Sequence, residues 1–112
     1  DRWAGDGPWD RPISVAVVGD FGLVGAGATF DRLRQLVDDG EVDFIVHLGD
    51  IAYADDAFLE RLWSFGYEEK WDAFMRRASR GYASKVPYMV VPGNHEAECH
   101  SPACLFSRRK LR

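Results

Sequence analysis

The sequence predicts an α/β fold in which parallel strands alternate with helices, and three apolar runs carry that prediction. The runs cover residues 13–18, 42–48 and 86–91, and each is rich in β-branched or aromatic side chains. Between the first two lies a segment with apolar residues at helical spacing, so strand, helix and strand follow one another. Such a βαβ unit favours a mostly parallel sheet with a right-handed crossover.

The first strand is expected over residues 13–18, where a nearly unbroken apolar run suits a strand covered on both faces. A glycine-rich loop follows it. Thr29 is a candidate N-cap for a helix that continues to Gly40, since glycine commonly stops a helix. The second strand is expected over residues 42–48.

An aromatic segment separates the second strand from the third. Residues 57–82 carry large apolar side chains at helical spacing, which predicts one or two amphipathic helices interrupted near Gly66. We expect these side chains in the core, although residues 65–71 could alternatively line a substrate groove. Pro87 suits the start of the third strand, residues 86–91. The side chains expected in the core are Phe58, Leu62, Trp63, Phe65, Trp71, Phe74 and Met75.

The length and charge of the chain exclude several classes of protein. A chain of 112 residues has the size of one domain, and 46% hydrophobic residues is typical of a folded protein. A net charge of -4 and a pI near 5.3 argue against a nucleic-acid partner. No apolar run approaches the roughly 20 residues that span a bilayer, so from the residues given we expect neither a membrane-spanning segment nor a signal peptide.

The two cysteines, Cys99 and Cys104, lie close together in a loop-like stretch. They could form a small disulfide loop, which would indicate an oxidising compartment, or remain two free thiols.

Polar side chains follow each of the three strands. Carboxyl ends of parallel strands meet at one edge of a sheet, where α/β proteins bind ligands. Carboxylate, amide and phenolate oxygens suit Fe(III), Mn, Mg or Zn, and two such cations about 3.5–4 Å apart can clamp a phosphate and turn a bound water into hydroxide. Phosphoester hydrolysis is the natural reaction. The side chains brought to this edge are Asp20, Asp50, Tyr53, Asn94 and His95.

These turns resemble known motifs. Asp20-x-Gly22, Gly49-Asp50-x-x-Tyr53 and Gly93-Asn94-His95-Glu96 are similar to the first three of five sequence blocks of the purple acid phosphatases, which are calcineurin-like metallophosphoesterases. The residues around them, 87–93 and 97–99, resemble the fungal and plant members in particular. The resemblance covers about residues 13–104 and implies the N-terminal half of a metallophosphoesterase β-sandwich flanked by helices.

The resemblance also implies a ligand set. Asp20 and Tyr53 would bind Fe(III), Asp50 would bridge to a divalent Fe, Zn or Mn, and Asn94 would bind that second metal. Related enzymes carry Asp-x-His at the first block, whereas this chain has Gly22 there and would use the phenol of Tyr53 instead, the source of the family's purple colour. The alternative is that Tyr53 merely packs beside the strand end.

Three histidines and one glutamate are interpreted separately. By resemblance His95 would contact the substrate phosphate or protonate the leaving oxygen, and a histidine that is cationic in mild acid suits both tasks. Its alternative role is to support the ligands by hydrogen bonding. His47, inside the second strand, is expected in the core or behind the ligands, and His100 in a loop. Glu96 would either orient its loop or be solvated.

The family's remaining blocks, Val-x-x-His and Gly-His-x-His, have no counterpart after Asn94. We therefore expect residues 13–105 to be a partial metallophosphoesterase domain with one sheet face bare. Residues 1–12 are expected to be a linker or the remnant of a preceding domain, which could be a β-sandwich, and residues 106–112 an atypical basic tail.

The leading hypothesis is an acid phosphatase that hydrolyses phosphomonoesters at a dinuclear metal centre, with little or no activity in this chain alone. The alternatives are a phosphodiesterase or nucleotide hydrolase of the same fold, and a truncated, non-catalytic product. The expected location is extracellular or within the secretory pathway.

Overall fold

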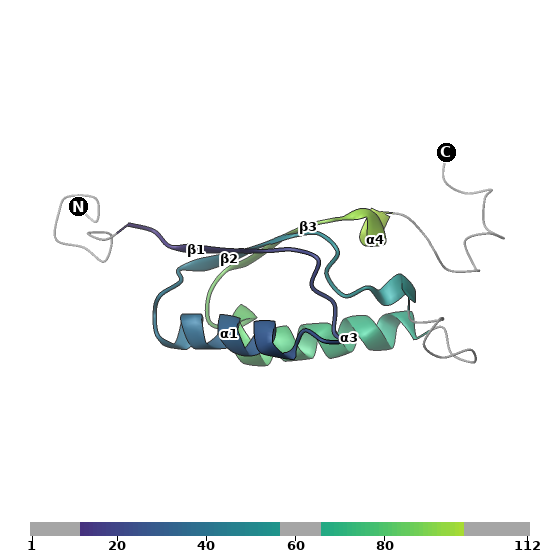
Figure 1. Ribbon diagram of the computed structural model, residues 1–112, viewed down its shortest axis with the longest axis horizontal. Coiled ribbons are helices and arrows are strands. Elements are labelled where there is room, and N and C mark those ends of the chain that lie inside the picture. The colour runs from purple at the N-terminus through teal and green to yellow at the C-terminus, as the bar shows by residue number, and fades with distance from the viewer. Residues whose placement is uncertain (1–11, 57–65, 98–112) are drawn as a thin grey trace.

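Three parallel strands form the sheet of the computed structural model, which describes residues 12–56 and 66–97. The strands are β1 (Val15–Val18), β2 (Phe44–Leu48) and β3 (Tyr88–Val91), and β2 lies in the centre. The register pairs Val15 with Phe44 and Ile45 with Tyr88. The predicted α/β class with a parallel sheet is confirmed (Figure 1).

Each strand begins two residues later than the sequence suggested. At the start of β1 the physical reason is a side chain. The backbone N–H of Ser14 donates to the Asp43 carboxylate at 2.8 Å, while the N–H of Asp43 donates to the Ser14 carbonyl at 2.8 Å. Because the Asp43 carboxylate accepts the Ser14 N–H, that N–H does not pair with the backbone of β2.

Helix α1 (Gly27–Asp38) connects β1 to β2. The prediction that Thr29 caps it is wrong, because the glycine-rich loop contributes the first turn and Ala26 occupies the cap position. The N–H of Phe30 donates to the Ala26 carbonyl at 3.0 Å, which leaves Thr29 inside the helix. The predicted stop at Gly40 is confirmed, since its φ of 69° is left-handed, a conformation that favours glycine.

Helix α3 (Tyr67–Ala78) begins after Gly66, as predicted, and continues into a π-helical segment, η2 (Ser79–Ala83). Phe74 is fully buried and Trp71 packs against the core, but Met75 is 45% exposed. The prediction of a buried Met75 is therefore wrong. Adjacent residues point about 100° apart on a helix, and Phe74 occupies the inner face. The other four side chains expected in the core lie within 57–65, outside the described residues.

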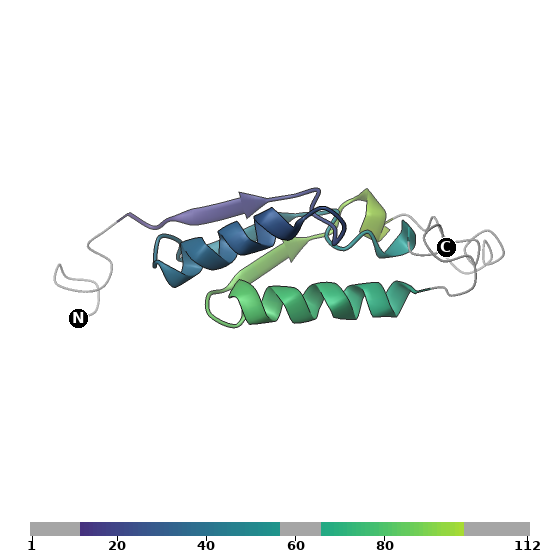
Figure 2. The same ribbon diagram turned by 60° about the horizontal axis from the view of Figure 1, so that its bottom comes forward.

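Both helices lie on the same face of the sheet (Figure 2). The core between them contains three edge-packed aromatic rings, with centroids 4.7 Å apart for Phe21 and Phe30 and 5.7 Å apart for Phe21 and Phe74. His47 is also fully buried there, and its Nδ1 lies 2.6 Å from the Tyr88 hydroxyl. The expectation that His47 is a core residue is confirmed.

The opposite face of the sheet is not covered by any described residue. Val17 is 59% exposed, so the expectation that β1 is covered on both faces is wrong for the described part of the chain. The expected bare face is confirmed, because Leu48 and Met89 are also more than half exposed. Among the described helices, none has both the length and the apolar character that crossing a membrane requires.

Replacing Phe74 by alanine should lower the free energy of unfolding by about 3–5 kcal/mol, because it leaves a cavity beneath the sheet. The matched control is Met75→Ala on the exposed side of the same helix, which should change it by about 0.5 kcal/mol or less. Urea unfolding measures both, and equal losses would contradict this description of the core.

The stability should also fall in mild acid because of His47. Burial lowers the pKa of this imidazole, against smaller opposing effects of Glu96 and Asp50. Below the ordinary histidine pKa of about 6.5, the unfolded chain therefore binds more protons at His47 than the folded chain does. The free energy of unfolding keeps its full value above that pH and falls as the pH drops below it.

Melting temperatures measured from pH 7 to pH 5 should therefore decline less steeply for His47→Leu than for the unaltered chain. Parallel curves would show that His47 does not carry this pH dependence.

Candidate metal centre

The loops after the three strands meet at one edge of the sheet, as expected. Backbone hydrogen bonds continue past the ends of β1 and β2, since the N–H of Phe21 donates to the Asp50 carbonyl and the N–H of Gly22 to the Ile51 carbonyl, both at 2.9 Å. Asp20 follows β1, Asp50 follows β2, and β3 leads into α4 (Asn94–Ala97). This edge is at the right of Figure 1, where β3 runs into α4.

Backbone conformation sets three residues of these loops apart. Asp20, Asp50 and Tyr53 have φ values of 57°, 51° and 50°, and they are the non-glycine residues with positive φ in the described ranges. The left-handed region costs an L-residue roughly 1–2 kcal/mol, and such strain concentrates at functional sites. All three are residues that the sequence marked as metal ligands.

Asp20 and Tyr53 meet directly, although they are 33 residues apart, and the phenol donates a hydrogen bond to the Asp20 carboxylate. Gly22 leaves room for the ring, because a Cβ there would lie 3.2 Å from Tyr53 Cδ2. A hollow of about 340 Å³ opens beside the pair and is also lined by Asp56 and Lys70. A carboxylate and a phenol that converge on one point form a suitable pair of donors for a hard trivalent cation.

The electrostatics of this pair indicate what a cation would change. The hydrogen bond to Asp20 raises the pKa of Tyr53 well above its usual range, with smaller contributions from burial and from the charges of Asp20, Asp50 and Asp56. The carboxylates therefore keep Tyr53 protonated. A cation placed among them would reverse the sign of the local field and favour the phenolate.

Glu96 joins the loops that follow β2 and β3. Its carboxylate accepts backbone N–H bonds from Asp50, Ile51 and Gly93, each at 2.8 Å. Of the two roles weighed for Glu96, orienting the loop is the one observed. The loops touch closely, because a Cβ on Gly49 would lie 2.5 Å from Gly93 Cα and one on Gly93 would lie 2.3 Å from Asp50 Oδ1.

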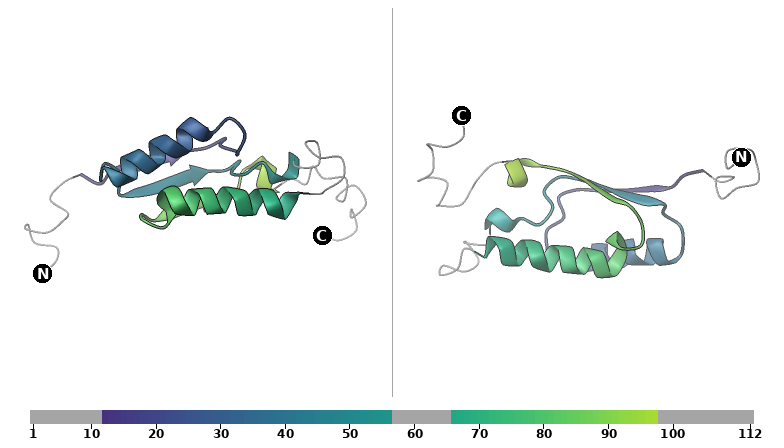
Figure 3. Two further views of the ribbon diagram at one scale, coloured as in Figure 1. Left: turned by 90° about the horizontal axis from the view of Figure 1, so that it is seen from below. Right: turned by 180° about the vertical axis from the view of Figure 1, so that it is seen from behind.

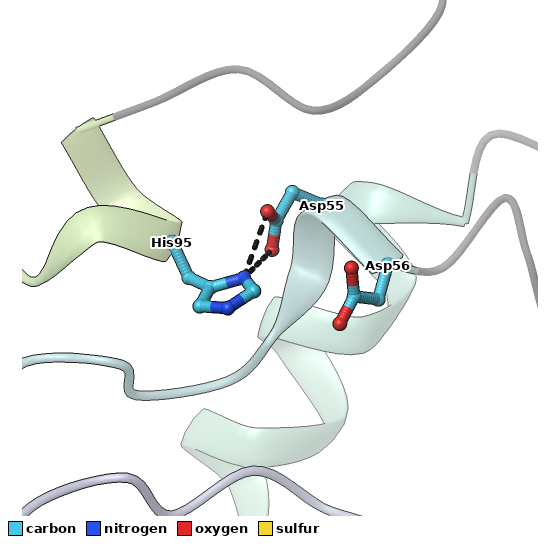
Figure 4. Close-up of side chains that lie close together, drawn as sticks. All are labelled: Asp55, Asp56 and His95. Carbon is cyan, nitrogen blue, oxygen red and sulfur yellow. Dashed lines mark hydrogen bonds and ion pairs between the residues drawn. The ribbon is translucent and has the colours of Figure 1, made fainter.

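His95 is held by an acid that the sequence analysis did not single out. Its Nδ1 lies 3.0 and 2.9 Å from the two carboxylate oxygens of Asp55, a residue of η1 (Ala54–Asp56) that is only 4% exposed (Figure 4). The Tyr53 ring lies 4.3 Å from the imidazole, centroid to centroid. A carboxylate at Nδ1 fixes the ring orientation and places a proton on that nitrogen.

A signal for Asp55 was available in the sequence. Asp55 lies two residues after Tyr53, in the loop that carries Asp50. From sequence alone, however, an acidic residue in a polar loop is expected to be exposed to solvent.

Asp55, Asp56 and His95 also form a group whose ligand atoms lie within 4.8 Å of one another, the spacing a cation could use. We interpret Asp55 and His95 as a hydrogen-bonded pair instead, because both carboxylate oxygens of Asp55 are within bonding distance of Nδ1. In Figure 4 the Asp56 carboxylate stands apart from that contact.

The ligand set expected from the sequence is brought together only in part. Asp20 contacts Tyr53, and Asp50 Oδ1 accepts the backbone N–H of His95 at 3.0 Å. Asn94 is exposed at the start of α4, and its side chain makes no hydrogen bond within the described ranges. The assignment of these residues as ligands remains a prediction. Cys99, Cys104 and His100 lie outside the described residues.

The sequence profile of the calcineurin-like phosphoesterases matches residues 13–111. Purple acid phosphatase 15 of Arabidopsis thaliana is 34% identical over 104 residues, which cover 81% of this chain and 19% of that protein. "Probable inactive purple acid phosphatase 1" of the same plant is 37% identical over 62% of this chain and 10% of its own length. Acid phosphatase type 7 of Mus musculus is 38% identical over 73% of this chain and 16% of that protein. The chain thus spans a fifth or less of these relatives.

A solved structure has a similar fold. The purple acid phosphatase PPD1 from yellow lupin (Lupinus luteus) seeds superimposes with a TM-score of 0.52 at 31% identity, over 73% of this chain and 14% of that one. The mixed α/β architecture described above matches that fold.

Replacing Glu96 by glutamine should loosen the two loops, because one acceptor oxygen becomes a donor facing backbone N–H groups. We expect a loss of about 1–3 kcal/mol in unfolding free energy and faster amide exchange at Asp50 and Ile51. The control is Glu68→Gln, an exposed glutamate in the first turn of α3. Unchanged amide exchange in Glu96→Gln would contradict the role given to this carboxylate.

Proposed function

This chain belongs to the calcineurin-like phosphoesterase family, and on that premise we propose that it supplies the first half of a dinuclear metal centre that hydrolyses phosphomonoesters. Its homologues include purple acid phosphatases, a family that implies such a centre. The observation that carries the proposal is the contact between Asp20 and Tyr53, which joins a carboxylate and a phenol from separate loops beside Asp50.

The proposed ligands follow the donor chemistry of this edge. Asp20 and Tyr53 would hold Fe(III), Asp50 would bridge, and Asn94 would join a divalent Fe, Zn or Mn. Asp50 follows the central strand, which supports a bridging role between ligands from the two outer strands. The bound cations would supply the positive charge that stabilises a phosphate in its transition state and activates water.

His95 has a second part in the proposal. Its ring is held from the Nδ1 side by both carboxylate oxygens of Asp55, so the imidazole keeps one orientation at this edge. In mild acid it would donate a hydrogen bond to the phosphate or a proton to the leaving oxygen. Asp55 would act through His95, as a positioning residue.

The activity is proposed for a protein that also contains the later histidine blocks. This chain spans 19% of purple acid phosphatase 15, and Asp20, Asp50, Tyr53 and Asn94 offer each metal only part of a coordination shell. The chain alone should therefore bind metal weakly and turn over little or no substrate. An extracellular or secretory location is proposed together with a Cys99–Cys104 disulfide.

Tyr53→Phe tests the ferric ligand. The protein containing this chain, loaded with Fe(III), should show a visible tyrosinate-to-iron absorption band that Tyr53→Phe abolishes. Tyr67→Phe, which alters an exposed tyrosine at the start of α3, should keep the band. The same preparations should be assayed with a chromogenic phosphomonoester at about pH 5, where histidine is largely cationic.

The proposal fails if the iron-loaded protein shows neither the band nor hydrolysis of the monoester. Faster hydrolysis of a phosphodiester than of the monoester would keep the metal centre but overturn the substrate class.

A further inference from the structure

A groove lined by arginines lies between α1 and α3 on the helical side of the molecule. Its volume is about 540 Å³, and it shares no residue with the loops of the candidate metal centre. The two helices run side by side beneath the sheet, as the left view of Figure 3 shows. Arg34 stands on the α1 side, whereas Arg76, Arg77 and Arg80 stand on the side of α3 and η2.

Helical spacing explains how the sequence builds this groove. Residues 73, 76, 77 and 80 recur at i, i+3, i+4 and i+7, so they form one stripe along α3 and the first turn of η2. At one end of the groove η2 lies against α1, since a Cβ on Gly81 would be at ordinary contact distance, 3.9 Å, from Arg34 Cβ. Arg34 of α1 and the three arginines of α3 and η2 therefore line one open groove.

One of the arginines is held in place at the groove. The guanidinium carbon of Arg77 lies 4.3 Å from the centroid of the Phe30 ring, which is only 3% exposed. A cation over an aromatic face is attracted to it, which holds the Arg77 guanidinium at the groove. Arg76 is oriented as well, since its Nε donates to the Asp72 carbonyl at 3.2 Å.

The charge of the groove is opposite to that of the whole chain. Asp31 is the acid among its lining residues, beside four arginines, whereas the chain has a net charge of -4. Within the described ranges none of these four arginines forms an ion pair with an acid. Like charges one helical turn apart, such as Arg76 and Arg80, repel each other and destabilise a helix. An anionic ligand would relieve that repulsion.

We propose that this groove binds a small anion that carries more than one phosphate group. A guanidinium group binds two phosphate oxygens with two parallel hydrogen bonds. Arginines on the two sides of the groove can therefore bind separate phosphates of one ligand. The volume falls within the roughly 300–1,000 Å³ of small-molecule sites. A long nucleic acid fits less well, because beyond the groove it would meet a chain of net negative charge.

Isothermal titration calorimetry with sodium tripolyphosphate tests the proposal on the metal-free chain. The double variant Arg76→Gln/Arg80→Gln should bind about tenfold more weakly or worse, because two charge-assisted contacts are lost. The control is Arg32→Gln, an exposed arginine of α1 outside the groove that bonds Gln35. It should bind within about twofold of the unaltered chain, as a distant exposed charge predicts.

Two further variants distinguish binding in the groove from misfolding and from binding at the strand edge. Asp31→Asn should tighten binding, since it removes the negative charge among the lining residues, and a gain cannot result from misfolding. Lys70→Gln, which removes a cation that lines the hollow beside the candidate metal centre and not the groove, should leave the affinity unchanged.

The proposal is overturned if tripolyphosphate does not bind, if the arginine variant binds it as well as the unaltered chain, or if Lys70→Gln abolishes binding. Equal affinity for orthophosphate, or tighter arginine-dependent binding of a DNA duplex, would overturn the assignment to a small anion with several phosphates.

Discussion

The three hydrogen bonds accepted by Glu96 are the constraint on which the arrangement of this edge depends. One carboxylate collects backbone N–H groups from the loop after β2 and from the turn after β3, so the two loops are held as a unit. The close approach of Gly49 to Gly93 is possible because neither residue carries a Cβ. This contact decides where the Asp50 carboxylate and the His95 backbone lie.

The arrangement of the loops at this edge costs free energy in backbone conformation and in charge repulsion. Asp20, Asp50 and Tyr53 adopt left-handed conformations, and several carboxylates share one edge. Hydrogen bonds offset part of that cost, since Asp20 accepts a hydrogen bond from Tyr53, and Asp55 is paired with His95. The remaining excess of oxygen donors favours binding of cations, which is consistent with the chemistry of the phosphoesterase family.

Three surfaces of the described part of the molecule differ in charge and polarity. The helical side carries the arginine-lined groove, the strand edge carries the acids, and the sheet face opposite the helices exposes apolar side chains such as Val17, Leu48 and Met89. An acidic average charge therefore hides a basic region, because opposite charges cancel in the sum. The charge that argued against a nucleic-acid partner gives no information about a small groove.

The sequence alone determined the three strands, the helix start after Gly66, the stop at Gly40 and the donors that gather at the strand edge. These features follow from short-range patterns, since β-branched runs, helical spacing and glycine conformations act locally. It misjudged Thr29, Met75 and the covering of β1, because a cap and a buried face depend on which neighbours arrive. Only the tertiary structure decided that Asp55 holds His95, that Glu96 joins two loops and that arginines of α1 and α3 share a groove. Such contacts arise when distant segments pack against each other, so no local pattern records them.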